Sequence, residues 1–516
     1  MHEEQLIIHE KEPMRAKLTD IVKEKLGSAA AITRESNFAH ARDLLQRADR
    51  NWTLVVVSET APLDAHTRLG KPGNSSPACC FVRELRMDRE IPVLGLGRTG
   101  STHLKDLLQN WKHTAHAEQH DFAGIAERVD ALVTERPLEP SLELEWELGE
   151  SSSNFWRVLS HGMNGLDVGP RPFTIETRQM DALLGTSLAL MNSKPRDWAK
   201  LFDGVSAQIY ELLFDARQNR ELVNIFFREV AKVGYEKLRI SFKLAPRWQQ
   251  AVVEALRVES DIRRSWMLNS PMVRRFSVTN DPSKGTLNLQ PLYSEKKRRE
   301  EKVNCLIITA DAQYGEIEKG DWAGTYPALK KIREEADDIA TVLNAAKDRE
   351  VGIVRSIDLG EHDINIEHRV VEALKENDWH IVHFAGHGVI GSHGMPGLVL
   401  NARLGEVMKF ETLANAIRGT QFLFVSSCSS ADPAFISSAI AFSIPAVIGY
   451  RWPVDDNDAA EFAKVFYSAL FARGHTYKSL EQALLRARNK ALDFNAAGNT
   501  WASPVLLTQT PARAAA

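Results

Sequence analysis

Two apolar runs in the last third of the chain each end in a chemically reactive side chain. Residues 379–388 (WHIVHFAGHG) carry His387 between two glycines, and residues 421–430 (QFLFVSSCSS) carry Cys428 among serines. Both runs are short and rich in β-branched or aromatic residues, which predicts two buried strands. Reacting groups in an open parallel sheet sit just past the carboxyl ends of its strands, so we expect His387 and Cys428 at one edge.

The alternation of short apolar runs and amphipathic stretches extends over residues 303–508 and predicts one α/β unit. Pro327 fits the first position of a helix, and Asp455 or Asp456 can cap another helix that continues to Leu470. Further strands are expected at residues 305–309, 351–354, 398–400, 445–449 and 505–507.

Residues 1–135 repeat a strand–helix pattern, which predicts a separate doubly wound parallel sheet. Within it, residues 95–100 (GLGRTG) match the glycine spacing of a dinucleotide-binding turn. That turn normally belongs to the first strand–helix unit, and this is the fourth. We therefore interpret the run as a glycine-rich turn, with nucleotide binding as the alternative.

The middle of the chain is less regular. Prolines, serines and an acidic cluster in residues 136–200 predict a linker with irregular packing. Residues 201–302 form a second α/β region that ends in a charged run at 295–302 and offers no nucleophile–base pair. The expected organisation is thus a domain at 1–135, a linker at 136–200, a half-domain at 201–302 and a reactive domain at 303–516.

Composition excludes several classes of protein. The 516 residues are 44% hydrophobic with a formal net charge of −4, which is typical of a globular protein and gives no reason to expect nucleic-acid binding. We expect no membrane association, because no apolar run is long enough to span a bilayer, and a cytoplasmic location, because the first residues do not resemble a signal peptide. Four cysteines are too few for a disulfide framework.

Cysteine catalysis needs thiolate character and a base within hydrogen-bond reach. Cys428 is expected in a strand-to-helix turn, where the helix N-terminus would favour the thiolate and supply backbone N–H groups to an oxyanion, with the N–H of Gly388 as a second donor. We interpret Cys79, Cys80 and Cys305 as packing residues.

The other histidines of this region are expected to have different roles. His383 is interpreted as a packed or hydrogen-bonded strand residue, and His393 as an exposed loop residue. A zinc site built from them and His387 would lack a carboxylate or cysteine at ligand spacing. We expect neither a metal nor a cofactor.

Three stretches together resemble the CHAT family of caspase-like cysteine peptidases: residues 383–388 (HFAGHG), 426–430 (SSCSS) and 447–456 (VIGYRWPVDD). The order also fits, with the histidine first and the cysteine 41 residues later, and residues 501–506 are similar to that family's last strand. Residues 201–280 more weakly resemble the non-catalytic half that precedes such domains. The departure is in the turn after the nucleophile, where serines replace an acidic–polar pair.

This resemblance implies a caspase-like three-layer fold with a mainly parallel sheet. It implies His387 as general base and acid, Cys428 as the nucleophile that forms an acyl-enzyme, and the amides of Gly388 and Cys428 as oxyanion donors. A substrate pocket would involve four residues, although packing or helix capping explains the last three of them equally well: Arg451, Trp452, Asp455 and Asp456.

The first domain resembles a response-regulator receiver in its third strand and in residues 81–86 and 91–94. Its chemistry is incomplete, because Ser58 stands where the phosphorylated aspartate is expected and only Glu10 remains of the first acidic pair. The expected lysine is missing from residues 117–119. We interpret it as a degenerate receiver on which a protein activator or sensor docks.

The resulting expectation is a regulated endopeptidase that cleaves a protein partner, in bacterial defence or programmed cell death. The alternatives are a catalytically silent scaffold of the same fold and a nucleotide-responsive module.

Overall fold

The structure is a computed structural model. It describes residues 3–9, 11–26, 31–36, 38, 41, 51–58, 61, 78, 81, 93–97, 114–118, 121–134, 142–149, 154–160, 168–193, 195–214, 219–223, 238–257, 266–276, 302–310, 314–347, 351–360, 365–417, 420–428, 430–441, 444–471, 480–495 and 498–509. The chain forms two compact units, Met1–Leu138 and Glu139–Ala516.

The first unit contains a five-stranded parallel sheet in the order β2-β1-β3-β4-β5, the order of doubly wound folds such as the flavodoxin type. Its central strand is apolar throughout Leu54–Val57 because parallel strands are buried on both faces. The predicted doubly wound sheet is thus confirmed, whereas the likeness to a receiver stays a prediction. The elements are β1 (Glu3–Ile8), α1 (Glu12–Leu26), β2 (Ala31–Glu35), β3 (Asn51–Ser58), β4 (Val93–Gly97), β5 (Thr114–Glu118) and α5 (Phe122–Thr134).

The described part of the glycine run at residues 95–100 is not a turn. Gly95 and Gly97 both lie inside β4, and residues 98–100 fall outside the described residues. The first two glycines of the dinucleotide pattern therefore occupy a strand, where that pattern requires them in the turn that follows.

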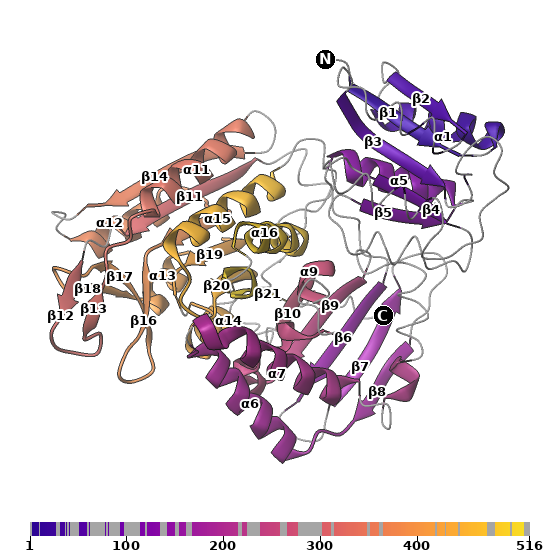
Figure 1. Cartoon of the computed structure of the whole chain (residues 1–516). Coiled ribbons are helices and arrows are strands. Elements are labelled where there is room, and N and C mark those ends of the chain that lie inside the picture. The colour runs from indigo at the N-terminus through magenta and orange to yellow at the C-terminus, as the bar shows by residue number, and fades with distance from the viewer. Residues whose placement is uncertain are drawn as a thin grey trace, which may run out of the picture. The chain divides into compact units, whose positions relative to one another are not determined.

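The second unit is organised on one eleven-stranded sheet with the order β14-β11-β15-β19-β20-β21-β10-β9-β6-β7-β8 (Figure 1). Most neighbours are parallel; the pairs β20–β21, β6–β7 and β7–β8 are antiparallel. The strands are β6 (Leu142–Leu148), β7 (Asn154–Ser160), β8 (Val168–Phe173), β9 (Leu238–Leu244), β10 (Met272–Phe276), β11 (Val303–Ala310), β14 (Val351–Leu359), β15 (Ile381–Ala385), β19 (Phe422–Ser426), β20 (Ala446–Tyr450) and β21 (Pro504–Gln509).

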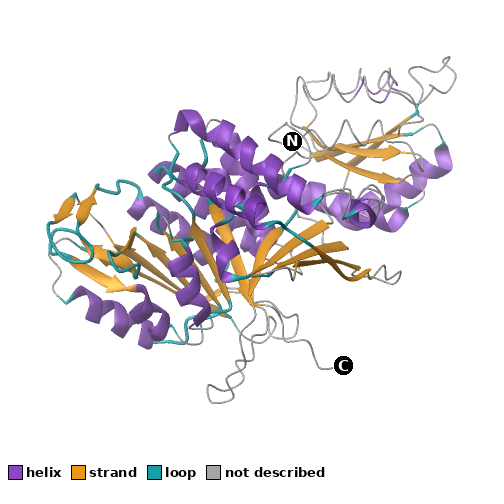
Figure 2. Ribbon diagram, turned by 90° about the horizontal axis from the view of Figure 1, so that it is seen from below, coloured by secondary structure: helices purple, strands orange, loops and turns teal. Residues whose placement is uncertain are grey.

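Helices cover both faces of the half that contains β15 and β19 (Figure 2). Phe422 and Phe424 point toward α11 (Ile332–Ala345), α15 (Asp456–Leu470) and α16 (Leu480–Phe494), which share one core with them. Leu423 and Val425 pack on the other side with α12 (Ile366–Lys375), α13 (Phe410–Ala416) and α14 (Pro433–Ala441). Two-sided burial explains why this strand is continuously apolar, and it confirms the predicted mixed α/β, mainly parallel fold class.

Smaller elements complete this unit. They are α6 (Thr177–Met191), α7 (Pro195–Leu213), η2 (Pro246–Gln250), η3 (Val253–Ala255), α9 (Trp266–Asn269), the hairpin β12 (Gly315–Ile317) and β13 (Gly324–Tyr326), η6 (Thr500–Ala502), and the sheet β16 (His387–Ile390), β17 (Pro396–Asn401) and β18 (Glu406–Lys409). No helix among the residues described here is long and apolar enough to cross a membrane.

The predicted linker at 136–200 is wrong, because this segment supplies β6, β7, β8 and α6. In β6, leucines and Trp146 face the core, and the acidic residues between them occupy the other face. There Glu143 accepts hydrogen bonds from Ser241 Oγ at 2.7 Å and Arg275 Nη2 at 2.9 Å, so the acidic cluster belongs to an amphipathic strand. The prolines at 170 and 172 lie in β8, an edge strand, where a missing N–H is tolerated.

The expected helix start at Pro327 is also wrong. The helix α11 begins at Ile332, with Lys331 at its N-cap position. Pro327 instead precedes it in an irregular segment, and this frees its carbonyl group for another role.

Candidate active site

Strand register places His387 and Cys428 just past the ends of two neighbouring parallel strands. Ala385 of β15 lies opposite Ser426 of β19, and Gly386 N donates to the carbonyl oxygen of Ser426 at 3.2 Å. His387 follows Ala385 by two residues, and Cys428 follows Ser426 by two residues.

The backbones meet at Gly388. A Cβ atom there would lie 2.8 Å from the carbonyl oxygen of Cys428 and 3.1 Å from Ser427 Cβ. This approach explains why glycine follows the histidine, since any side chain would force the two strand ends apart.

The turn that carries Cys428 is fixed by Ser430. Its hydroxyl lies 2.9 Å from the carbonyl oxygen of Val425 and 2.7 Å from that of Ser427, and it accepts the N–H of Tyr450 at 2.9 Å. Gly449 allows this approach, because a Cβ there would lie 2.7 Å from Ser430 Oγ. The serine that departs from the family pattern thus joins the turn to β20.

Cys428 lies between the end of β19 at Ser426 and the start of α14, in the strand-to-helix connection expected from the sequence. α14 starts at Pro433, and the carboxylate of Asp432 accepts the N–H of Ala434 at 2.8 Å. The first turn of α14 is therefore capped by the side chain of Asp432.

The imidazole of His387 is oriented by a backbone carbonyl. Its Nε2 lies 2.7 Å from the carbonyl oxygen of Pro327. A carbonyl can only accept, so Nε2 carries the proton and Nδ1 keeps the lone pair that a base requires. Sequence reasoning missed Pro327, because a main-chain carbonyl leaves no mark in the residue type.

Burial dominates the electrostatics of the pair. It lowers the pKa of His387, against the opposing effects of the Pro327 carbonyl and the carboxylate of Asp456. It raises the pKa of the Cys428 thiol, which the backbone N–H of Val454 opposes and Asp456 reinforces. Both shifts favour uncharged forms, so at neutral pH Cys428 carries a thiol and His387 a neutral imidazole.

Asp456 is the predicted pocket residue whose charge acts on both partners, where it works to raise the pKa of His387 and that of the Cys428 thiol. Its Oδ2 accepts the N–H of Lys331 at 2.6 Å, and burial raises the pKa of the carboxyl. The carboxylate is half-buried and linked to the segment that carries Pro327.

The other three predicted pocket residues have structural roles. Arg451 is 6% exposed and pairs with Glu254, while Trp452 packs edge-on against Trp198 with ring centroids 5.9 Å apart. Asp455 caps α15, where its side chain accepts the N–H of Asn457 at 2.9 Å. Packing and capping, the alternatives weighed from the sequence, therefore describe Trp452 and Asp455, and the side chain of Arg451 is buried as well.

The remaining histidines and cysteines behave mostly as expected. His383 is buried, with Nε2 at 3.1 Å from Glu335 Oε1, whereas His393 is exposed beside Asp321. Cys305 is buried in an apolar core, and burial raises the pKa of its thiol. Cys79 and Cys80 lie outside the described residues. Within the described ranges, no three His, Cys, Asp or Glu side chains are arranged to hold a metal ion.

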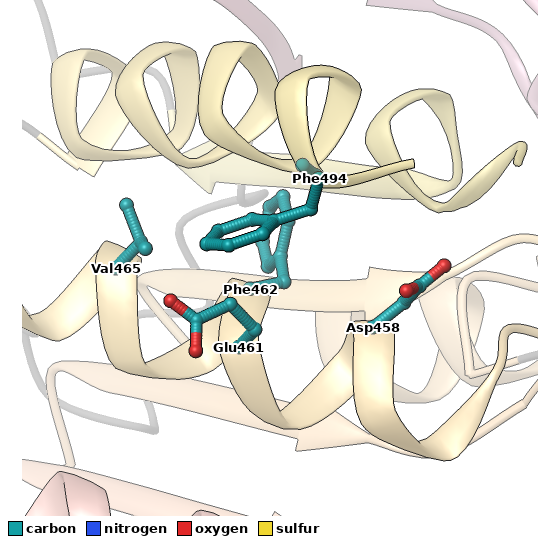
Figure 3. A pocket seen from close by; sticks show the side chains of 6 residues that line it. Asp458, Glu461, Phe462, Val465 and Phe494 are labelled. Atoms are coloured by element: carbon teal, nitrogen blue, oxygen red, sulfur yellow. The ribbon is translucent and has the colours of Figure 1, made fainter. Parts of the chain in front are cut away.

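A small pocket lies elsewhere, between α15 and α16 (Figure 3). It is lined by Asp458, Glu461, Phe462, Val465, Ala491 and Phe494, the last of these exposed. None of these residues contributes to the arrangement around His387 and Cys428.

Comparison with known proteins gives a family match over most of the second unit. The CHAT domain matches residues 205–509, which is more than half of the 516 residues. A search of curated proteins finds no match.

Similar solved structures include gingipain R, an Arg-specific cysteine proteinase, at 11% identity and a TM-score of 0.36 over 55% of this chain and 65% of that one. The Saccharomyces cerevisiae separase–securin complex is similar at 9% identity and 0.38 over 79% and 33%. The complex of pro- and mature domains of Porphyromonas gingivalis RgpB is similar at 10% and 0.35 over 65% and 77%. The chain thus spans about two thirds of the gingipain R chain and one third of the separase chain.

Proposed function

Because the chain belongs to the CHAT-domain family, we propose that it is a cysteine endopeptidase with Cys428 as nucleophile and His387 as base. The observation that carries this proposal is the contact between the two strand ends at Gly388, together with the carbonyl of Pro327 that leaves Nδ1 of the imidazole unprotonated. A nucleophile, an adjacent base and a group that orients the base are the parts required for acyl transfer.

In the proposed reaction, Nδ1 of His387 accepts the thiol proton as Sγ of Cys428 attacks the scissile carbonyl carbon. The N–H groups of Gly388 and Cys428 stabilise the oxyanion. The imidazolium then returns its proton to the leaving amine, and the acyl group remains on sulfur. A water molecule, deprotonated by the same Nδ1, releases the acid and restores the thiol.

Asp456 supports a preference of this site for cationic substrate groups. A half-buried carboxylate that acts on both His387 and Cys428 would attract a positive side chain more strongly than an exposed one. The proposal also includes a protein substrate and a protein activator that docks on the first unit. A role in defence or cell-death signalling is proposed from the family resemblance alone.

One observation favours the alternative of a silent scaffold of the same fold. Burial raises the pKa of Cys428, and a thiol with little thiolate character is a poor nucleophile. A peptidase should be labelled covalently by an electrophilic probe, whereas a silent scaffold should not. A nucleotide-responsive module should not be labelled either.

The test is labelling with peptide acyloxymethyl ketones that carry arginine or leucine at P1. We expect covalent attachment at Cys428, faster for the arginine probe, and loss of labelling in Cys428→Ala and His387→Ala. Cys305→Ala is the matched control, because that thiol is buried away from the site, and it should label as wild type does. Absence of labelling in wild type at every probe and pH would favour the scaffold.

A further inference from the structure

A buried group of charges joins the two halves of the large sheet. Glu254 of η3 binds Arg274 of β10 through two contacts, Oε1 to Nε at 2.7 Å and Oε2 to Nη2 at 3.1 Å. The same Oε2 accepts Nη2 of Arg451 at 2.5 Å. All three side chains are at least nine-tenths buried, so water contributes little to balancing their charges.

The carboxylate is the principal partner of Arg451. Glu254 faces two guanidinium groups at once, and these lower the pKa of its carboxyl well below the usual range even though burial raises it. Nη1 of Arg451 has no hydrogen-bond partner in the described part of the chain. Burial and the nearby Arg274 lower the pKa of Arg451 to about 9, as expected for a cation that is incompletely compensated.

Arg451 begins the segment that approaches the sulfur. It directly follows β20, and its N–H lies 3.1 Å from both the carbonyl and the hydroxyl oxygen of Ser503. Three residues later, the backbone N–H of Val454 acts to lower the pKa of the Cys428 thiol against the larger effect of burial, and two residues further Asp456 accepts the N–H of Lys331, in the segment that carries Pro327. Residues 451–456 are thus fixed at one end by buried charge. They follow Tyr450 directly, and the carbonyl oxygen of Tyr450 accepts the N–H of Ala431 at 2.9 Å, so this segment starts at the turn that carries Cys428.

We propose that Glu254 is a positioning residue for the candidate active site, acting through Arg451 to hold residues 451–456 against Cys428. The half of the sheet that carries no reactive pair thereby sets the reactivity of the half that does. The catalytic relevance of this link rests on the proposed function, but the link itself concerns only the state of one thiol.

The experiment measures the rate of iodoacetamide alkylation of Cys428 against pH in the full chain, followed by mass spectrometry of the Cys428 peptide. The backbone N–H of Val454 lowers the pKa of the Cys428 thiol, so a variant that displaces Val454 should raise the pH midpoint of alkylation. Glu254→Gln and Arg451→Met should each slow alkylation at pH 7 about threefold to tenfold, because one pKa unit changes the thiolate fraction about tenfold. The double variant should be no slower than the slower single variant, because both act through one link.

Glu143→Gln is the matched control. Glu143 is also a buried carboxylate that pairs with an arginine of β10, Arg275 at 2.9 Å, but it makes no described contact with residues 451–456. It should lower the melting temperature and leave the alkylation midpoint unchanged. If Glu254→Gln does not fold, Glu254→Asp keeps the charge one methylene shorter and should give a smaller shift in the same direction.

Equal midpoints in wild type and in the folded Glu254 and Arg451 variants would overturn the proposal and leave the cluster a purely structural feature. Alkylation needs no peptidase activity, so this outcome is independent of the proposed function. If the variants show the predicted shifts in the alkylation midpoint and the wild-type chain cleaves no substrate, the proposed peptidase function is refuted and the positioning role of Glu254 stands.

Discussion

Replacing Gly388 by alanine tests whether the contact between the two strand ends organises the site. The new Cβ would lie 2.8 Å from the carbonyl oxygen of Cys428, whereas ordinary contact starts at 3.4 Å, so the turn must retreat by about 0.6 Å. The Cβ of Ser427 would also lie 3.1 Å from the new Cβ, so a small rotation of the turn cannot relieve the clash without a second close contact. The overpacking should cost about 1–3 kcal/mol of unfolding free energy.

The effect on reactivity should be larger than the effect on stability. A misplacement of about 1 Å between reacting groups can cost about 100-fold in rate, so we expect probe labelling of Cys428 to slow by about 10- to 100-fold. The assay is the second-order rate constant of labelling with the arginine ketone, measured beside thermal unfolding.

Gly204→Ala in α7 is the control for this substitution. A Cβ at Gly204 meets nothing within 4 Å, so alanine there should stabilise the helix by about 0.5–1 kcal/mol and leave labelling unchanged. Wild-type labelling and stability in Gly388→Ala would refute the contact as the organising feature.

Three further predictions concern the surroundings of the pair. Because burial lowers the pKa of His387 and raises that of the Cys428 thiol, the acid limb of the pH–rate profile should lie at lower pH than for an exposed histidine, and the alkylation midpoint at higher pH than for an exposed cysteine; an alkylation midpoint near neutrality would contradict the burial argument. Ser430→Ala should lower the unfolding free energy by about 1–3 kcal/mol in denaturant titrations, since it leaves the buried N–H of Tyr450 unpaired; an unchanged denaturant midpoint would show that the hydroxyl of Ser430 does not stabilise the turn. Asp455→Ala should cost about 1 kcal/mol by loss of the cap with labelling intact, whereas Asp456→Asn should reduce the preference for the arginine probe over the leucine probe; the opposite pattern would exchange their roles.

The sequence predicted the parts of the fold that local patterns encode. Strands β15 and β19 are mostly apolar because both faces are buried, and their carboxyl ends lie at one edge because the strands are parallel neighbours. The position of His387 near Cys428 follows from that register. The sequence offers Asp455 or Asp456 as the cap of α15, and the structure shows that Asp455 supplies it; the alternatives could be named because capping depends on residue types a few positions apart.

The errors have physical causes of two kinds. The acidic residues of β6 were mistaken for a linker, because their partners, such as Ser241 and Arg275, lie about 100 residues or more away in the chain. The role of Pro327 was missed because it is exercised by a main-chain atom.

Long-range pairing also hid the charge cluster. Arg451 looked like a pocket residue beside the family motif, and only the fold reveals that Glu254, 197 positions earlier, holds it inside the core. Local sequence patterns carry no information about a partner at that separation, so such residues are found only once the sheet order is known.

The most direct test of the central claim is a comparison of new protein N-termini in cells that express wild type, Cys428→Ala, His387→Ala or Cys305→Ala at equal levels. If Cys428 and His387 catalyse proteolysis, wild type and Cys305→Ala should share a set of cleavage products, with basic residues enriched before the cut, that is absent from the other two variants. The same products in cells that express Cys428→Ala would contradict it.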